Sequence, residues 1–439
     1  MKSTTNSNAN VVCQYPKEWK LRRLGDFGDS YSGLSGKSKE DFGDGYTYVP
    51  YKNVFLNAFV SENFLERVAI EPGETQSQVE KGDILFTISS ETPEEVGMSS
   101  VVAHKPAEEL YLNSFCFGFR PRESCLDIAY SGYAFRSEYM RRRITFLAQG
   151  STRYNISKKK VLDIKLPVPP LHEQRGIAEI LITVDSKLNL ISRQIEVAQI
   201  LKRGLIQKLF SRGAVGNDMH GEWTPRNLSL SPPGVLPNGW QVVRLGDIAP
   251  LVRRPVDVHS EGIYPELGLR SYGKGTFHKP ALRGQEVGNK RLFEIKEGDL
   301  LFSNVFAWEG AVAVAREEDD GRFGSHRYIT CVVDKSRARV DYLFRFLTTS
   351  AGLALLELAS PGGAGRNKTL GLSALANIPI PLPPLAQQKK VSLMLNEVDK
   401  KTASLLARRA QCEALKQGLM QKLLTGEWRV KAAVAEIAA

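Results

Sequence analysis

The chain of 439 residues carries the same series of motifs twice. The segment Leu166–Gln174, which reads LPVPPLHEQ, returns 214 positions later as Ile380–Gln388, which reads IPLPPLAQQ. The segment Leu201–Leu209 returns as Leu415–Leu423 at the same offset. Because the offset stays constant over about forty residues, each copy holds one rigid element without insertions, as expected after duplication of a structural unit.

The two copies match more loosely upstream of these elements. Trp19–Asp26 matches Trp240–Asp247 at an offset of 221, and Gly82–Phe86 (GDILF) matches Gly298–Phe302 (GDLLF) at an offset of 216. The drift means that the loops between these landmarks differ in length, which is how binding surfaces diverge on a retained scaffold. We predict that the two tryptophans and the two apolar strands belong to the core and have no binding role.

Length and composition limit the class of protein. A chain of this length is expected to form two or more domains, and its hydrophobic fraction of 42% suffices for packed cores. No apolar run reaches the ~18 residues of a membrane span. The polar start Met1–Asn6 is not a secretory signal, so we expect a cytoplasmic protein. The five cysteines show no metal-binding spacing and are predicted to be reduced thiols: Cys13, Cys116, Cys125, Cys331 and Cys412.

A long amphipathic helix is predicted in each copy, directly after the proline pairs at 169–170 and 383–384. Apolar residues then follow in alternating steps of four and three, the heptad pattern of a coiled coil. About forty residues at ~1.5 Å each make a rod of ~60 Å, longer than one domain core, so the helices are expected to pack on each other. A surface helix that covers its own domain is the alternative. The predicted helix–helix interface comprises Ile177, Leu181, Val184, Leu188, Ile191, Ile195, Val391, Leu395, Val398, Leu405, Leu419 and Leu423.

The order of elements predicts an α+β fold. Two tandem target-binding domains, each mixed α/β and strand-rich, alternate with two long α-helices that form an antiparallel coiled coil. An antiparallel return of the second helix would place the domains at opposite ends, related by a pseudo-two-fold axis, so that equivalent faces could meet two segments of a duplex. The predicted boundaries are 1–168 for the first domain, 169–214 for the first helix, 215–234 for a linker, 235–382 for the second domain, 383–428 for the second helix and 429–439 for a C-terminal tail.

The net charge of +11 and the pI near 9.3 favour an anionic partner, most commonly nucleic acid. Basic residues mix with Tyr, Asn, Ser and Gly in segments of loop character, where Lys and Arg can bind phosphates and Arg, Asn, Ser and Thr can read base edges. Ordinary solvated loops are the alternative. The predicted DNA-binding residues in these loops are Lys37, Lys39, Ser151, Thr152, Arg153, Tyr154, Asn155, Arg270, Tyr272, Lys274, His278, Lys279, Arg366, Asn367 and Lys368.

Two further segments of the second copy diverge from the first copy in a loop-like way. Asn304 and Trp308 follow the second GD-containing strand, where Asn304 could bond an adenine edge and Trp308 could stack or wedge. Buried packing is an equal alternative for both. His326 and Arg327 form the other candidate pair for DNA binding in this copy.

Catalytic signatures fail at required positions. The segment Gly36-Lys37-Ser38 resembles the end of a phosphate-binding loop, but Tyr31 stands where the first glycine is required. The six histidines show no metal-ligand spacing and no triad order. We therefore predict a binding and assembly subunit with no catalytic residues and no metal site of its own.

With these motifs in this order, the chain resembles a specificity subunit of a type I restriction-modification system. Each copy has the Trp…Leu-Gly-Asp opening, the Gly-Asp-x-Leu-Phe strand, the Pro-Pro-Leu-x-x-Gln junction and the Leu-Lys-x-Gly-Leu-x-Gln-Lys-Leu ending, followed by Gly221–Trp223 or Gly426–Trp428. The resemblance covers almost the whole chain. The second copy departs from it with Ala386–Lys389 in place of His172–Arg175, so no specific role is carried over to the acidic residue of the first copy.

The resemblance implies that each target recognition domain binds one half of an asymmetric, bipartite site in double-stranded DNA. It also implies that the helices hold the spacing and bind two methyltransferase (modification) subunits, which carry S-adenosylmethionine. Motor-nuclease (restriction) subunits, with ATP and Mg, would complete the restriction enzyme, and this chain would bind no cofactor itself. Two alternatives remain open: a stand-alone tandem-repeat DNA-binding protein, and a coiled-coil protein scaffold without DNA binding. Co-purification with a methyltransferase would separate these possibilities.

Overall fold

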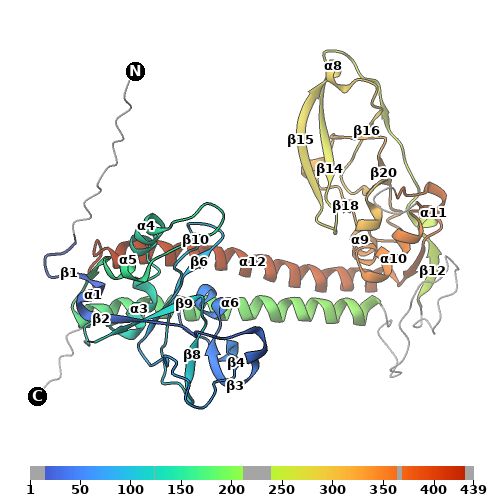
Figure 1. The fold of residues 1–439 in the computed structure, drawn as a ribbon. Helices are drawn as coiled ribbons and strands as arrows, with labels where there is room; N and C mark the ends of the chain where they lie inside the picture. The colour runs from blue at the N-terminus through green and yellow to red at the C-terminus, as the bar shows by residue number, and fades with distance from the viewer. Residues whose placement is uncertain (1–14, 123, 211–238, 363–367, 431–439) are drawn as a thin grey trace, which may run out of the picture. The chain divides into compact units, whose positions relative to one another are not determined.

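The computed structural model describes residues 15–122, 124–210, 239–362 and 368–430 (Figure 1). The chain divides into two compact units. Unit 1 consists of residues 1–192 and 407–439, and unit 2 consists of residues 193–406. Each unit therefore contains one mixed α/β domain together with parts of both long helices, and each is described by itself below.

Each unit contains its own core sheet, in which three antiparallel strands have the same order in both units. In unit 1 the order is β7 (Ser99–Val101), β5 (Ile84–Thr87), β9 (Cys116–Pro121), and β2 (Gly28–Ser32) adds a fourth strand beside β9. In unit 2 the order is β18 (Val312–Val314), β17 (Leu300–Ser303), β20 (Tyr328–Cys331). The GD-containing motifs supply the central strands β5 and β17, which are buried along their whole length, as a continuous apolar run predicts.

The aspartate of each GD-containing motif has a structural role. Asp83 accepts the Glu80 N–H at 2.8 Å, and Asp299 accepts the Lys296 N–H at 2.8 Å, so each carboxylate closes the turn before its strand. Both carboxylates are buried, and each is paired with an arginine, at 2.7 Å in unit 1 and 2.6 Å in unit 2. A buried carboxylate needs such a partner to offset its desolvation, which explains how the motif accommodates an acid directly before an apolar strand.

The first and last strands of each domain pair with each other. In unit 1, β1 (Lys20–Arg23) pairs antiparallel with β11 (Lys165–Val168), and in unit 2, β12 (Gln241–Arg244) pairs with β21 (Pro379–Leu382). Short helices complete the shared scaffold. They are α1 (Leu24–Phe27), α3 (Ile128–Ala134), α4 (Glu138–Leu147) and α5 (Lys158–Leu162) in unit 1, and α7 (Leu245–Ile248), α9 (Val340–Leu347), α10 (Ser350–Leu358) and α11 (Leu372–Ala376) in unit 2.

The outer sheets differ between the two units (Figure 1). Unit 1 has a three-stranded sheet in the order β4 (Glu66–Val68), β3 (Phe42–Val49), β8 (Leu110–Leu112). Unit 2 has a five-stranded sheet in the order β13 (Pro255–Val256), β16 (Leu292–Glu294), β19 (Phe323–Ser325), β14 (Ile263–Leu269), β15 (Thr276–Arg283). The remaining short elements are η1 (Lys39–Asp41), α2 (Tyr51–Leu56), η2 (Glu62–Phe64), β6 (Ser89–Ser90), β10 (Tyr154–Asn155), α8 (Gly284–Val287), η3 (Ala307–Glu309) and η4 (Glu317–Asp319).

The two long helices begin directly after the proline pairs, as predicted. Helix α6 covers Leu171–Phe210 and helix α12 covers Leu385–Leu424, with 40 residues each. A fully buried glutamine in the first turn joins each helix to its domain. The amide of Gln174 donates to the Cys125 carbonyl at 2.9 Å, and the amide of Gln388 donates to the Arg337 carbonyl at 3.1 Å. These bonds give the glutamine of the Pro-Pro-Leu-x-x-Gln motif its physical reason.

The helices run antiparallel, and the same contacts occur in both units. In unit 1, residues 171–192 of α6 lie along residues 407–424 of α12, and Asp185 pairs with Lys416 at 2.6 Å. In unit 2, residues 193–210 lie along residues 385–406, and Asp399 pairs with Lys202 at 2.6 Å. Adding 214 to the numbers of Asp185 and Lys202 gives Asp399 and Lys416, so the two ion pairs are equivalent in the repeat. The predicted antiparallel coiled coil and its internal repeat are thus confirmed at the level of single contacts.

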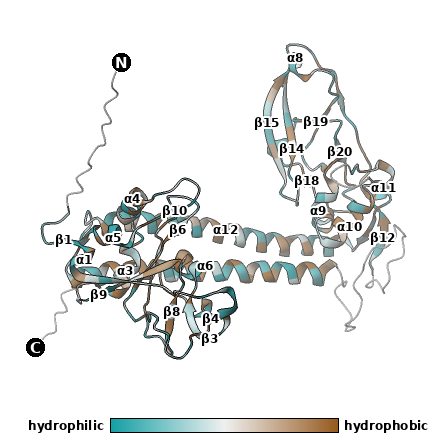
Figure 2. Cartoon of the chain, in the orientation of Figure 1, coloured by the Kyte–Doolittle hydropathy of each residue, from teal (hydrophilic) through white to brown (hydrophobic). Residues whose placement is uncertain are grey.

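Most heptad positions are buried in both helices. Hydrophobic residues recur along α6 and α12 in Figure 2, and the predicted seam residues are buried or half-buried. In unit 1 the seam residue Leu181 shares a cluster with Leu423 of α12 and with Tyr130 of the domain. In unit 2 Leu205 packs against a cluster that includes Leu395. The seam therefore packs on the partner helix and on the domain of the same unit, which combines the two alternatives that the sequence left open.

The two repeated tryptophans differ in burial. Trp19 is buried and donates to Glu173 Oε2 at 3.0 Å. Trp240 donates to Gln387 Oε1, at the equivalent position, also at 3.0 Å, but it is only half-buried. The core prediction is therefore right for Trp19 and wrong for Trp240. In unit 1 an additional residue covers the Trp19–Glu173 pair, because Arg429 donates to Glu173 at 2.6 Å. Arg429 is the first residue of the segment 429–439, which was predicted as a tail. The start of that segment packs against unit 1 instead.

Replacing Arg429 tests whether this contact holds unit 1 together. The carboxylate of Glu173 is 1% exposed, so Arg429→Ala leaves it buried with only the Trp19 indole as a partner. We expect unit 1 to lose about 1–3 kcal/mol in free energy of unfolding, measured by denaturant titration. Adding Glu173→Gln, which copies Gln387 of the second repeat, should restore most of the loss. A double variant as unstable as the single one would show that the ion pair is not the cause.

Candidate nucleic-acid interface

In unit 2 the structure brings together loops that lie far apart in the sequence. We define the recognition loop cluster as residues 270–275, 304–310, 325–328 and 368–370. Main-chain hydrogen bonds join these loops: the Tyr272 N–H donates to the Glu309 carbonyl at 2.8 Å, and the Asn304 N–H donates to the Arg327 carbonyl at 2.7 Å. The Leu370 N–H donates to the Asn304 carbonyl at 2.8 Å. Candidates from four sequence segments therefore share one surface.

Basic and aromatic side chains alternate on this cluster. The Lys274 ammonium lies 5.6 Å from the centroid of the Tyr272 ring, and the Lys368 ammonium lies 4.9 Å from the Trp308 ring. Trp308 is half-buried and donates to the Val305 carbonyl at 3.1 Å, so packing and stacking are both open to it. The remaining predicted members Arg270, Asn304, His326 and Arg327 are exposed or half-exposed. The Lys368 ammonium pairs with Glu357 at 2.6 Å, whereas the other basic members offer cations for phosphates, and the rings can stack on bases.

His278 and Lys279 lie on strand β15, beside the recognition loop cluster in sequence. The His278 ring nitrogen Nε2 lies 2.9 Å from the buried carboxylate of Asp319. Burial alone would raise the pKa of Asp319, but hydrogen bonds from Arg316, Thr276 and His278 outweigh it and lower the pKa. The carboxylate therefore stays charged and holds the half-exposed imidazole in place. The Lys279 ammonium lies 5.6 Å from the Tyr328 ring.

In unit 1 the predicted residues fall on two separate loops. Residues 151–155 form one loop, in which β10 pairs with β6 and the Arg153 guanidinium lies 5.5 Å from the exposed Phe115 ring. Ser151, Thr152 and Asn155 are exposed, and Tyr154 is half-buried. Lys39 is exposed on the other loop. Its neighbour Lys37 is different, because its side chain is 5% exposed and its ammonium pairs with Glu74 at 2.5 Å. The hydrogen bond from Lys37 lowers the pKa of Glu74 to about 2. Because the Lys37 ammonium is paired and covered, it has no exposed charge that could bind DNA.

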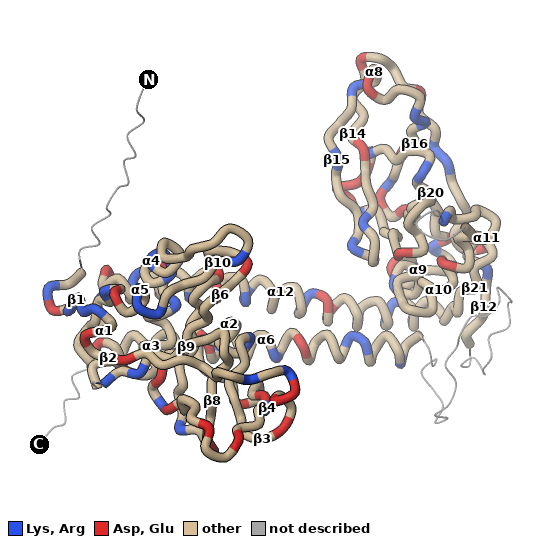
Figure 3. The backbone as a smooth tube through the Cα atoms, in the orientation of Figure 1, with Lys and Arg blue, Asp and Glu red and all other residues tan. Residues whose placement is uncertain are grey.

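Sequence reasoning missed a basic surface on helices α4 and α5 of unit 1, where Figure 3 shows Lys and Arg gathered. The signal was present as two runs of three like charges, at 141–143 and 158–160. Arg141 is half-buried and donates to main-chain carbonyls, so it is structural. Its neighbours and the lysines 158–160 face outward, and Phe146 on the same helix is 87% exposed. An exposed ring among cations is the same combination as in unit 2.

Two predicted DNA-binding residues, Arg366 and Asn367, lie outside the described residues, as does the predicted linker 215–234. Within the described ranges, no group of three or more His, Cys, Asp or Glu side chains is placed to hold a metal ion. None of the described helices is long and apolar enough to cross a membrane.

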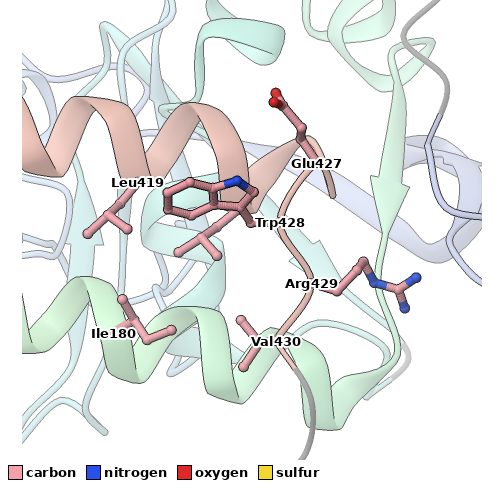
Figure 4. A pocket seen from close by; sticks show the side chains of 7 residues that line it. Ile180, Leu419, Glu427, Trp428, Arg429 and Val430 are labelled. Atoms are coloured by element: carbon pink, nitrogen blue, oxygen red, sulfur yellow. The ribbon is translucent and has the colours of Figure 1, made fainter.

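A different kind of surface lies at the end of the helix pair in unit 1 (Figure 4). An open groove of about 600 Å³ is lined by Ile180 of α6, by Leu419 and Leu423 of α12, and by residues 427–430. Trp428 is 55% exposed and lies beside Leu419, while Val430 points toward Ile180 (Figure 4). The groove is apolar and lacks the basic side chains of the loops, apart from Arg429, which pairs with Glu173. It suits a protein partner better than a nucleic acid.

Comparisons with known proteins agree with this organisation. A Methanocaldococcus jannaschii protein named for the specificity subunit of the type I restriction enzyme MjaX is 26% identical over 97% of each chain. The specificity subunit of the type I restriction enzyme MjaVIII from the same organism is 24% identical, over 95% of this chain and 94% of its own. A chain solved in a study of complex assembly and conformational transition of the type I R-M system shares the fold. It has a TM-score of 0.57 and 16% identity, covering 94% of this chain and all of that one.

The family match follows the internal repeat. The family described as "Type I restriction modification DNA specificity domain" matches residues 16–199 and again residues 237–414. Each match contains one domain and most of the long helix that follows it. Because the two matches together cover most of the sequence, the chain belongs to the type I restriction-modification DNA specificity family.

Proposed function

We propose that this chain reads an asymmetric, bipartite site in double-stranded DNA, with one half-site bound by each recognition domain. The observation that carries the proposal is that each domain has an equivalent core sheet and an equivalent junction with its long helix. The outer sheets and loops of the two domains differ. A repeated scaffold with divergent loops suits two related tasks on two different sequences. The half-sites then differ because the loops differ.

The recognition surfaces are the recognition loop cluster in unit 2, and the loop 149–155 with helices α4 and α5 in unit 1. Lysines and arginines on these surfaces would bind phosphates and set the register on the duplex. Asn304, Arg327 and Arg153 carry the donors that pair with base edges in the major groove. The chain's net charge of +11 supports the same partner.

The helices are proposed to bind two methyltransferase subunits. Besides its seam, α6 carries the exposed apolar residues Ile182, Leu190, Val197 and Leu201. At ~100° per residue these lie within an arc of about 100° on the face opposite the seam. Together with the groove around Trp428, they offer apolar surface to protein partners. S-adenosylmethionine would be bound by the methyltransferases, and ATP and Mg by motor-nuclease subunits, all in the cytoplasm.

Single arginine variants test the assignment of one domain to each half-site. The full chain, co-expressed with its methyltransferase, should methylate adenines at one bipartite sequence, found by genome-wide mapping. Arg153→Ala should weaken binding by about fivefold to a hundredfold and relax only the first half-site, and Arg327→Ala should do so only at the second. A phosphate contact would instead lower affinity for all sequences and reduce the salt slope by about one.

Arg409→Ala provides the matched control. Arg409 is exposed on α12, where it pairs with Glu413, so the variant removes the same charge outside both recognition domains. Its target and affinity should equal those of the wild type. Relaxation of the same half-site by both recognition-domain variants would refute the proposed division of labour. Failure of any methyltransferase to co-purify would favour a stand-alone DNA-binding protein, and absence of DNA binding would favour a protein scaffold.

A further inference from the structure

The hairpin turn between β14 and β15 holds an aromatic residue in a conformation that L-residues rarely adopt. Tyr272 and Gly273 both have φ of +63°, and the Lys274 N–H donates to the Ser271 carbonyl at 3.4 Å. Two consecutive residues with positive φ form a type I′ turn, whose first central position favours Asn, Asp or Gly. Tyr272 is the only non-glycine residue with positive φ within the described part of the chain. A tyrosine there is disfavoured because its Cβ crowds the following carbonyl.

The surrounding structure holds this turn in place. The Tyr272 N–H donates to the Glu309 carbonyl at 2.8 Å, and the Gly273 N–H donates to the Gly310 carbonyl at 2.8 Å. The Ser271 hydroxyl donates to the Glu309 carboxylate at 2.9 Å. The turn is therefore fastened to the neighbouring loop of the recognition loop cluster. Strain of this kind persists only where the surroundings over-determine it, and it concentrates at functional sites.

The ring of Tyr272 contributes little to the stability of the folded protein. Tyr272 is 70% exposed, so its strained position is not compensated by burial of the ring. Lys274 lies over the ring, with 5.6 Å from its ammonium to the ring centroid. Phe306, on the loop that anchors the turn, is 41% exposed. An exposed ring on an anchored turn, beside a lysine, offers a flat apolar face and a positive charge a few ångströms apart, which matches a nucleobase and its phosphate.

We propose that Tyr272 is a stacking residue of the second recognition domain. Its ring packs against a base at a locally unstacked step of the second half-site, and Lys274 binds a phosphate next to that base. The inference rests on the proposed function and adds to it a deformation of the DNA that the domain reads. Because the turn is rigid before binding, little conformational freedom is lost when the ring engages. Side chains that insert at a base step unstack it and kink the duplex.

Two substitutions distinguish the contribution of the tyrosine ring to DNA binding from that of the turn conformation. Tyr272→Asn places a residue that suits a type I′ turn and removes the ring, whereas Tyr272→Phe keeps the ring. The probes are duplexes selected from a randomised library by the wild-type chain assembled with its methyltransferase. In these duplexes 2-aminopurine replaces each adenine in turn and reports unstacking by its fluorescence. Tyr46→Asn, an exposed tyrosine in unit 1, is the matched control.

We expect wild type, Tyr272→Phe and Tyr46→Asn to raise fluorescence at one position of the second half-site other than the adenine that the methyltransferase flips for methylation. Tyr272→Asn should lose that rise and bind about tenfold to a hundredfold more weakly. Its Tm should equal the wild-type value or exceed it by up to about 4 °C, because the strain is relieved. Wild-type affinity and fluorescence in Tyr272→Asn would overturn the inference, and so would weaker binding with a lower Tm and an unchanged fluorescence rise. A wild-type assembly that selects no sequence would overturn the proposed function itself.

Discussion

The first half of the chain, ended before residue 216, will form a homodimer that directs methylation to an inverted repeat of the first half-site. This half keeps one recognition domain and all of α6. In the intact chain Ile177 and Leu181 pack in one cluster with Leu423 and Leu424 of α12, which the half lacks. The exposed apolar seam should therefore drive association with a second copy.

The second copy can supply each missing contact. By the offset of 214, Leu209 takes the place of Leu423, and Lys202 takes the place of Lys416. Lys202 of one copy would then meet Asp185 of the other, as Lys416 meets Asp185 in unit 1 and Lys202 meets Asp399 in unit 2. Two identical halves would be related by a true two-fold axis, so the bound site should become symmetric as well.

Sedimentation and methylation mapping measure this result. Lys202→Asp in the half-chain should weaken the homodimer about tenfold, because it places like charges opposite each other at two related positions. Adding Asp185→Lys exchanges the two charges and should restore dimerisation. A stable monomer, or methylation still confined to the asymmetric site of the intact chain, would refute the assignment of one domain to each half-site.

Lengthening both helices by three heptads will increase the preferred distance between the half-sites by about one turn of the duplex. The insertions follow Arg193 in α6 and Ala407 in α12, which are equivalent positions of the repeat. Twenty-one helical residues add ~32 Å, close to the ~34–36 Å of one turn. Whole heptads keep the seam in register, and a whole turn of DNA keeps the same groove facing each domain. Both half-site sequences should remain unchanged.

A library of duplexes with the two half-sites at varied spacing measures the outcome. The wild type should select one spacing, and the lengthened chain should select a spacing about nine or ten base pairs longer. The same insertion in α6 alone is the control, because it moves Lys202 away from Asp399 and should lower stability. An unchanged spacing, with intact binding to both half-sites, would show that the helices do not set the separation.

The sequence predicted those features that depend on local order. The heptad seam and the two central strands could be predicted because a helix or strand repeats its buried face at a fixed interval. Ile177 and Leu395 are buried where the heptads placed them, and Ile84 is buried in its apolar run. The antiparallel pairing followed from the duplication, because two equal seams in one chain can cover each other. The family resemblance rested on the same repeated motifs, and the family match divides the chain in the same way.

The tertiary structure decided which candidates are available for binding. Lys37 looked like its exposed neighbour Lys39, but Glu74 pairs with it and covers its charge. Arg429 looked like part of a tail, yet it pairs with Glu173, which lies 256 positions earlier in the chain. Tyr272 belonged to a basic loop by sequence, and only the backbone shows that it is strained and anchored. In each case the decisive partner lies far away in the chain or is a main-chain group, and no local pattern of residue types encodes such contacts.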